Sequence, residues 1–490
     1  MIMEAEIEKT TGIIIPPLTA PERSFGTGVA KTIAGYDIPR SLSEYTENDS
    51  GRAELFVDTY QLKIRYVPAW GCWLLWEGHR WMRDETNYIT NLAVEHHRGL
   101  QSKIIDEVSD FKERNRMLSQ TLKWGDIKRI RDMLAIASSD PRIVVDYRKL
   151  DANPSLLGVK NGVWDFEKGE MRAGSPSDLI TRQALCKYNP DAECPMWESH
   201  IKFAAQGDPQ MMVFLQRIAG YSFTGYTSEE VWFFHHGSGK NGKSVFCDTL
   251  RLLCHDYAIK VNSSLYTRDK FNKLPEDQLA SLEGRRLACG PEVDEGERLA
   301  EARIKELCTT NATINGRLQY ARQNAFQLTA KLWIYGNHYP DIRGTDDGVW
   351  RRLRLIPWTA QVESGQVDKN FSQKLIEREG EGILRWVLLG AQEWKRRGDL
   401  GTPSSVAAAS AEYRLQEDVL VDYVEGELCL DASLWCSRQA LWEHYSAWTL
   451  RAGINRIGVK KFYERIRQLS GVSDPKRNGQ RGFSGVSFTS

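Results

Sequence analysis

An eight-residue run, Gly237–Ser244, has the composition of a phosphate-binding loop. It matches the pattern G-x-x-x-x-G-K-[ST] at every fixed position. Its glycines allow backbone N–H groups to face phosphate oxygens at the positive end of the helix that follows. Lys243 is expected to reach the β- and γ-phosphates, and the Ser244 hydroxyl to bind Mg²⁺. The predicted nucleotide-binding residues are Gly237, Ser238, Gly239, Lys240, Asn241, Gly242, Lys243 and Ser244.

The context of this loop supports the interpretation. Residues 231–234 can form a buried strand before it, and residues 245–253 can form a helix after it. A chance glycine-rich turn would not need both neighbours. His235 and His236 could be metal ligands, but a polar strand end explains them better. The loop predicts nucleotide binding only, because kinases, GTPases and motors share it.

After the loop, two apolar runs that could form strands each end in a polar residue. Glu292 ends a weakly apolar run from residue 285, where a carboxylate could hold Mg²⁺ and polarise the attacking water. Asp294 and Glu295 are second candidates, and an acidic surface turn is the alternative. Asn337 ends the apolar run 331–336, where its amide could contact the γ-phosphate and the water.

An arginine pair, Arg351 and Arg352, stands just before the apolar run 353–357. A guanidinium placed against the nucleotide of a neighbouring subunit would stabilise the charge that develops in the transition state. Paired arginines are usually exposed surface residues. The pair therefore indicates a catalytic role only in combination with the loop, Glu292 and Asn337.

The bulk composition is that of a soluble globular protein with about two to four domains. Charged residues make up 27% of the 490 residues, and 65 basic side chains balance 65 acidic ones. The nine scattered cysteines include no C-x-x-C pair, which argues against a zinc site or disulfides. Acidic residues at the N-terminus and the lack of a long apolar run argue against a signal peptide and a membrane span. We expect a cytoplasmic protein.

The chain is divided into four predicted regions. An aromatic β-hairpin lies at 66–84, helical spacing runs from 87 to 139 with a break near Trp124–Gly125, and a second hairpin spans 161–172. The tryptophans of the first hairpin could stack on bases, but a small-domain core is favoured. Strands and helices alternate from 205 to 395, which indicates an α/β domain. The predicted regions are a flexible leader (1–52), an N-terminal α+β domain (53–205), an ATPase domain (206–395) and a C-terminal DNA-binding region (396–490).

The order of loop, carboxylate, strand-end Asn and Arg pair resembles the motifs of superfamily 3 helicases. More closely, the chain is similar to phage and plasmid replication proteins related to the poxvirus primase-helicase. The similarity covers roughly residues 55–490 and includes "RYVPAWGCWLLWEGHRWMRD", "KNGVWDFEKGEMRAG", "GSGKNGKS" and "LWIYGNHYPDIRGTDDGVWRRLRLIPW". It implies a P-loop, AAA+-like ATPase core with an N-terminal α+β domain and a C-terminal winged-helix domain. It also implies ATP and Mg²⁺ as ligands, Glu292 as the catalytic acid, Asn337 as the sensor, and Arg351 or Arg352 as the arginine finger.

The chain departs from the family pattern at one place. Cys308–Asn311 stands where relatives usually have a Thr-Gly-Gly-Asp run, so the assignment of the residues that follow is open. We interpret residues 315–326 as a β-hairpin whose tip, near Arg322, enters the central channel of a ring. Arg317, Tyr320 and Arg322 would contact DNA there. The alternative is an ordinary surface hairpin.

The C-terminal tail is basic in a chain of zero net charge. Residues 451–490 contain nine Lys or Arg against one Glu and one Asp. Val459, Phe462, Ile466 and Leu469 have helical spacing, and Asn478–Gly479 suits a tight hairpin turn. The tail resembles the winged-helix domain of the family; a solvated helix face is the alternative. The predicted DNA contacts are Lys460, Lys461, Arg465, Lys476 and Arg477.

Together these features predict an ATP-dependent DNA helicase. The resemblance implies a homo-oligomeric, hexameric ring that moves 3′ to 5′ on single-stranded and forked DNA in a bacterial or phage-infected cell. A primase-helicase is the second interpretation, but residues 1–52 are too few for a primer-synthesising domain and zinc-ribbon cysteines are lacking. We therefore expect a separate primase or polymerase as partner. The third is an ATP-gated DNA-binding regulator or defence ATPase that does not unwind.

Overall fold

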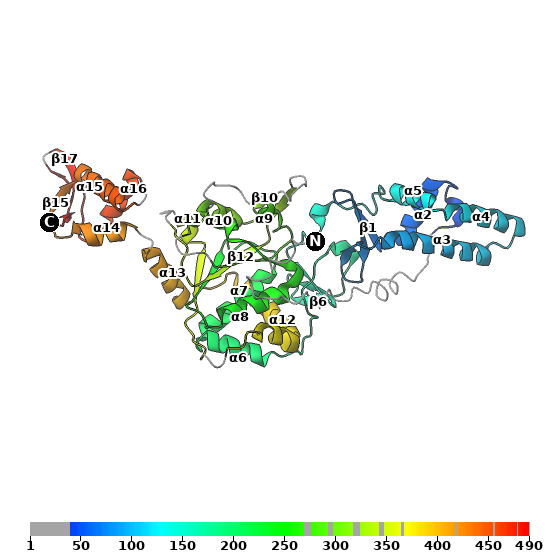
Figure 1. Cartoon of the computed structure of the whole chain (residues 1–490), viewed down its shortest axis with the longest axis horizontal. Coiled ribbons are helices and arrows are strands. Elements are labelled where there is room, and N and C mark those ends of the chain that lie inside the picture. Colours follow the sequence, from blue (N-terminus) through cyan, green and yellow to red (C-terminus); the bar gives the residue numbers. More distant parts are fainter. Residues whose placement is uncertain are drawn as a thin grey trace, which may run out of the picture. The chain divides into compact units, whose positions relative to one another are not determined.

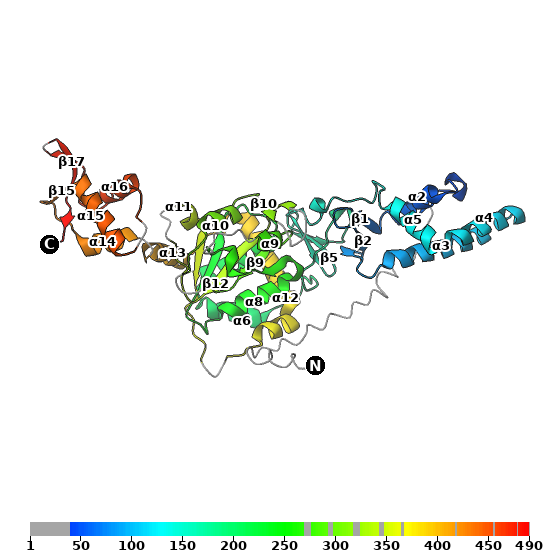
Figure 2. The same ribbon diagram turned by 45° about the horizontal axis from the view of Figure 1, so that its top comes forward.

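The structure is a computed structural model that describes residues 40–268, 276–292, 297–316, 324–342, 347–363, 367–416, 419–453, 456–477 and 479–489. The chain divides into two compact units (Figures 1 and 2). The first contains residues up to Asp151 and Ala173–Arg182, and the second contains Ala152–Arg172 and Gln183–Ser490. The predicted boundary at 205/206 does not coincide with this division, and the domain limits stay predictions.

The first unit packs four helices with a small antiparallel sheet. Phe56, Leu75, Leu92 and Met133 come from four different elements and are buried in one core. The predicted break near Trp124–Gly125 is confirmed, but a second break at residues 108–110 was not predicted. The elements are α2 (Asp49–Tyr60), β1 (Ile64–Val67), β2 (Cys72–Trp76), β3 (Trp81–Arg83), α3 (Tyr88–Glu107), α4 (Phe111–Trp124) and α5 (Ile127–Ala137).

That second break has a local cause. The Asp110 carboxylate accepts a hydrogen bond of 2.8 Å from the Glu113 N–H and so caps the start of α4. A side chain of this kind at the N-cap satisfies a backbone donor that a continuous helix would satisfy within itself. Helical spacing extends through residues 108–110 in the sequence, so periodicity alone did not reveal the break.

The tryptophans of the aromatic hairpin divide into two groups. Trp76 and Trp81 are buried, which confirms the core interpretation for these two. Trp70 and Trp73 are half-buried, and the Arg83 guanidinium lies 3.9 Å from the centre of the Trp70 ring.

Residues 40–52, which we predicted to be part of a flexible leader, are folded. Asn48 accepts a hydrogen bond from the Gly51 N–H and caps α2. Arg40 Nε lies 2.8 Å from Asp58 Oδ2, which fixes residue 40 to α2. A cap and a buried ion pair of this kind leave no periodic signal in the sequence. Residues 1–39 lie outside the described part of the chain.

The second unit is built on five parallel strands in the order β13-β7-β12-β9-β8, which confirms the predicted mixed α/β fold. Alternate side chains of β7 point to opposite faces: Phe233 joins one core, whereas Trp232 and Phe234 join another. Apolar residues on both faces require helices on both sides of the sheet. The strands are β7 (Trp232–His236), β8 (Ala258–Lys260), β9 (Leu287–Gly290), β12 (Lys331–Gly336) and β13 (Leu353–Pro357).

Helices pack on the two faces accordingly. One core contains residues of α6 (Pro195–Ala204), α7 (Pro209–Phe223), α8 (Lys243–Cys254) and α12 (Phe371–Arg397). The other contains residues of α9 (Glu276–Ala280), α10 (Glu301–Leu307), α11 (Asp347–Trp350) and α13 (Ser404–Gln416). The second predicted hairpin is present as the antiparallel sheet β4 (Leu156–Val159), β5 (Gly162–Asp165) and β6 (Glu170–Arg172).

The C-terminal segment consists of three helices and short antiparallel strands around a separate small core. Of the four residues with predicted helical spacing, Phe462 and Ile466 are fully buried in it and Leu469 is half-buried, whereas Val459 is exposed. Lys476 pairs with Arg481 and Arg477 with Gln480, which confirms a hairpin at this place, although Asn478 itself lies outside the described residues. The elements are α14 (Val419–Glu427), β14 (Leu428–Cys429), β15 (Trp435–Ser437), α15 (Arg438–Arg451), α16 (Val459–Arg467), β16 (Lys476–Arg477), β17 (Gln480–Ser484) and β18 (Ser487–Phe488). Among the described helices, none combines the length and the apolar character that a membrane span needs.

Candidate nucleotide-binding site

The predicted phosphate-binding loop connects β7 to α8 at the carboxyl end of the parallel sheet. Gly239, Lys240 and Gly242 have positive φ angles of 96°, 49° and 84°. Two of these three positions are glycine, which adopts such angles without strain. At Gly237 the backbone itself is crowded: a Cβ there would lie 2.1 Å from the Asn241 amide nitrogen. These glycines therefore have the backbone role that the motif predicted.

Lys243, at the start of α8, is buried and its ammonium is held by oxygen atoms only. Nζ lies 2.6 Å from Gly336 O, 2.9 Å from Asn337 Oδ1 and 3.1 Å from Gly237 O. Burial lowers the pKa of Lys243, and the negative charge of Glu292 opposes that shift. The ammonium thus lies between the end of β7 and the end of β12.

Glu292 and Asn337 are in direct contact. The Asn337 backbone N–H donates a hydrogen bond to Glu292 Oε1, and Asn337 Nδ2 lies 3.5 Å from Oε2. Strand register explains the contact, because Gly290 pairs with Ile334 and Glu292 therefore reaches the level of Gly336. The structure brings together Lys243, Glu292 and Asn337, which lie far apart in the sequence.

The segment that follows β13 runs alongside the loop. The Val362 N–H donates to Lys240 O at 2.7 Å, and Asn241 Nδ2 donates to Trp358 O at 3.1 Å. Gln361 Nε2 lies 3.4 Å from Ser238 Oγ. This support was not predicted, because the sequence 358–363 carries no motif.

The donor atoms at the predicted Mg²⁺ site are hydroxyl and carboxylate oxygens, which suit a hard cation. Ser244 and Glu292 are both exposed. Within the described ranges the Ser244 hydroxyl makes no hydrogen bond, so it is available as a ligand. Asp294 lies outside the described residues. The described residues also contain no group of three His, Cys, Asp or Glu side chains that could hold an ion without a nucleotide.

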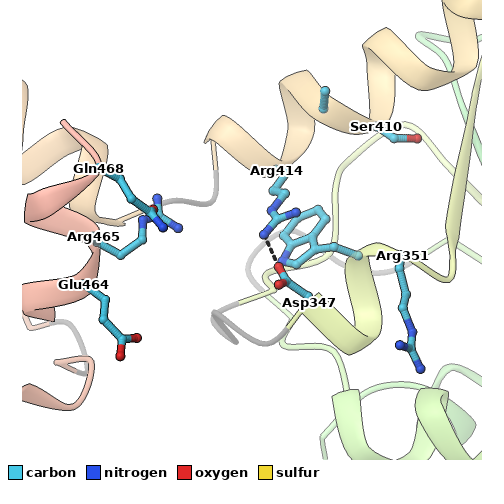
Figure 3. A pocket seen from close by; sticks show the side chains of 9 residues that line it. Asp347, Arg351, Ser410, Arg414, Glu464, Arg465 and Gln468 are labelled. Atoms are coloured by element: carbon cyan, nitrogen blue, oxygen red, sulfur yellow. Dashed lines mark hydrogen bonds and ion pairs between the residues drawn. The ribbon is translucent and has the colours of Figure 1, made fainter. Parts of the chain in front are cut away.

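The two arginines of the predicted pair have different environments. Arg352 is 8% exposed, and its Nη2 lies 3.0 Å from Glu230 Oε2 in the same chain. Arg351 is exposed at the end of α11. Figure 3 shows Arg351 directed away from the ion pair between Arg414 and Asp347.

The predicted DNA hairpin is present at its base. β10 (Thr313–Gly316) pairs antiparallel with β11 (Asn324–Gln327), and Ile314 lies opposite Phe326. Its tip, with Arg317, Tyr320 and Arg322, lies outside the described residues. The unusual segment before it packs against the chain just before β7, where the Asn311 N–H donates to Thr227 Oγ1 at 3.0 Å.

The basic residues of the tail are not all equivalent. Lys460 and Lys476 are exposed, whereas Arg465 is half-buried. Arg467 Nε lies 2.8 Å from Asp474 Oδ2, a carboxylate that also binds Arg438. Lys461 and Arg477 lie in α16 and β16, and their side chains are outside the described part. Asp474 therefore neutralises part of the predicted basic face, which charge counting in the sequence did not reveal.

Family comparisons assign two regions of the chain. Residues 53–206 match the family described as "D5 N terminal like", and residues 235–352 match a family of unknown function, DUF5906. The C-terminal region of NrS-1, in its A form apo structure, is a structural neighbour with a TM-score of 0.45 and 10% identity, covering 86% of this chain and 95% of that one.

Curated relatives come from large DNA viruses. The chain is 26% identical over 415 residues to "Putative helicase L207/L206" of Acanthamoeba polyphaga mimivirus, covering 76% of this chain and 42% of the relative. It is 29% identical over 218 residues to "Putative primase C962R" of African swine fever virus, covering 42% of this chain and 22% of the relative. The chain thus spans less than half the length of these relatives. It is similar over residues 53–206 to the D5 N terminal like family and elsewhere to proteins named as helicases and primases of large DNA viruses, which confirms the predicted relationship to the D5-like primase-helicase family.

Proposed function

We propose that this protein is an ATP-dependent DNA helicase of the superfamily 3 type. The observation that carries the proposal is the convergence of Lys243, Glu292 and Asn337 at one edge of a parallel sheet. The sheet order supports an AAA+-like core, since the strand that enters the loop lies between the Asn337 strand and the strand after the Arg pair. The relationship to proteins named as helicases supports DNA unwinding as the use of ATP.

The chain's own residues have separable roles in hydrolysis. Lys243 binds the β- and γ-phosphates, with the loop N–H groups around them. Asn337 contacts the γ-phosphate, and Glu292 orients the attacking water and accepts its proton. Ser244 and Glu292 would hold Mg²⁺, which would supply positive charge against the phosphates when it is bound with ATP. Arg351 acts on the nucleotide of a neighbouring subunit, because it is exposed whereas Arg352 is already bound to Glu230.

DNA binding is assigned to two places. The hairpin between β10 and β11 grips a single strand in the channel of a hexameric ring that moves 3′ to 5′. The C-terminal segment is a winged-helix domain, and its helix-and-hairpin construction with Lys460 and Lys476 exposed supports this role. A separate primase or polymerase works with the helicase at the fork.

The test is to measure ATP hydrolysis and the unwinding of a forked DNA by the wild type and by Lys243→Ala. Hydrolysis and unwinding should both be lost in the variant, since it removes the ammonium that lies beside Asn337 at the loop. Lys374→Ala, which removes an exposed lysine from α12, is the control and should behave as wild type. A wild-type protein that hydrolyses ATP and binds the fork without separating it would instead be an ATP-gated DNA-binding regulator or defence ATPase.

A further inference from the structure

Helix α13 leads from the ATPase core toward the C-terminal segment and is attached to the core along its length. The Leu355 N–H of β13 lies 3.2 Å from Ser410 Oγ. Arg414 forms an ion pair with Asp347 at the start of α11 (Figure 3). The helix therefore contacts both the strand after the Arg pair and the helix at whose end Arg351 lies.

Tyr413 is the centre of this attachment. Its side chain is 1% exposed, and its ring centre lies 5.1 Å from that of Trp350 in an edge-to-face arrangement. On another side the ring stacks on Tyr339, with ring centres 4.4 Å apart and planes inclined by 18°. Its hydroxyl donates a hydrogen bond to Pro340 O. Tyr413 thus contacts α11 and the segment that follows Asn337.

The aromatic contacts continue to the nucleotide site. Tyr339 stacks on His236, with ring centres 4.0 Å apart. His236 Nε2 in turn lies 3.1 Å from Asn337 O, the carbonyl of the residue whose side chain contacts Lys243. Tyr339 and Pro340 are two and three residues beyond Asn337. The segment that begins at Asn337 is therefore held by α13 through Tyr413 and by β7 through His236.

We infer that Tyr413 is a positioning residue for ATP hydrolysis: from α13 it fixes the Asn337 segment relative to α11, the helix that Arg351 directly follows. The inference rests on the proposed function. It adds that the position of Asn337 depends on α13, the helix that leads to the C-terminal segment. Offset-stacked and edge-to-face rings have a preferred geometry and resist displacement. Small displacements matter because misplacing a reacting group by about 1 Å can cost about 100-fold in rate.

The substitution Tyr413→Phe tests this role, because it keeps the ring and removes only the hydroxyl that bonds to Pro340 O. We expect kcat for ATP to fall about three- to tenfold, the size of effect that one lost hydrogen bond has. KM for ATP should stay within about twofold of wild type, since the phosphate loop does not touch Tyr413. Tyr413→Leu also removes both ring contacts and should lower kcat further.

The matched control is Tyr257→Phe. That buried hydroxyl also bonds a backbone group, the Gly158 N–H at 3.0 Å, but at the opposite end of the sheet. It should lower the melting temperature about as much as Tyr413→Phe and leave kcat unchanged. Unchanged kcat in a folded Tyr413→Phe, or an equal fall of kcat in Tyr257→Phe, would overturn the inference. The proposed function fails separately, if the wild type itself neither hydrolyses ATP nor unwinds a fork.

Discussion

The guanidinium of Arg352 is bound to Glu230 of the same chain, with Nη2 3.0 Å from Oε2, and its Nη1 donates to Gly348 O at 3.0 Å. Moving this buried cation away would break its ion pair with Glu230 and its hydrogen bond to Gly348 O. Arg351, next to it in the sequence, is exposed, as the proposed contact with a neighbouring subunit requires. The structure thus separates two arginines that the sequence leaves equivalent.

The two arginines should respond differently to substitution. Arg351→Ala should leave ATP binding and the melting temperature near wild type while lowering turnover by about 10³-fold or more, the effect of losing an arginine finger. Arg352→Ala should instead lower the free energy of unfolding by about 1–3 kcal/mol, since it removes a buried guanidinium together with its bonds to the half-buried Glu230 and Gly348 O. Nucleotide binding, hydrolysis and chemical unfolding distinguish them.

Mixing two inactive variants tests whether Arg351 acts on the nucleotide of a neighbouring subunit. Arg351→Ala and Lys243→Ala proteins are each expected to be inactive, but a mixed ring contains some sites with both an intact loop and an intact arginine. ATPase activity should therefore reappear in the mixture. If mixed rings form and remain inactive at every ratio, Arg351 does not act on a neighbour.

Arginines at the tip of the β10–β11 hairpin should couple ATP hydrolysis to DNA binding. Arg317→Ala combined with Arg322→Ala should leave basal ATPase intact, because β10 and β11 keep their pairing. Stimulation by single-stranded DNA and unwinding should both be lost, since cations on the loop hold the phosphate backbone. Unwinding by this variant at the wild-type rate would place the translocating residues elsewhere.

Salt dependence tests the C-terminal segment. Lys460→Ala combined with Lys476→Ala should reduce the slope of log affinity against log salt concentration by about 2, one counterion per lost phosphate contact. Basal ATPase should not change. Lys112→Ala with Lys123→Ala, both exposed on α4, is the control with the same charge change. An equal fall in slope in the control would show that the effect is one of total charge.

Stability should fall on acidification because four histidines are buried. Burial lowers the pKa of His96 and His235 to about 3, and that of His97 and His200 to about 4. The unfolded chain takes up these protons below about pH 6.5, whereas the folded chain does not. Folding is therefore most favoured above about pH 6.5 and weakens toward pH 4, by at most about 1.4 kcal/mol per pH unit for each histidine.

Urea unfolding at pH 7.5 and pH 5.5 measures this effect. His96→Phe keeps an aromatic ring among Phe56 and Tyr60 and removes one titrating group. Its loss of stability between the two pH values should be smaller than that of wild type. An equal loss in both proteins would mean that buried histidines do not set the acid sensitivity, and would leave carboxylates such as Asp58 as its source.

Much of the site could be predicted from the sequence because its parts are local patterns. Glycines at special backbone angles and polar residues that end apolar strands are recognisable without knowing the fold, which is why Lys243, Glu292 and Asn337 could be named. Contacts that depend on how distant elements pack could not. Nothing in the sequence of residues 404–416 indicates that Tyr413 lies against Tyr339. Likewise, the adjacent arginines differ only through Glu230, which lies more than a hundred residues earlier.

The contact between Lys243 Nζ and Asn337 Oδ1 also has a consequence for nucleotide affinity. The Lys243 ammonium is buried and held by three oxygen atoms of the protein. If ATP binds as proposed, its γ-phosphate would replace Asn337 Oδ1 at this ammonium, and the freed amide could then bind the phosphate or the water. Filling the site would exchange one set of hydrogen bonds for another. Such an exchange would favour release after hydrolysis, because the same asparagine could return to the lysine once the γ-phosphate has left.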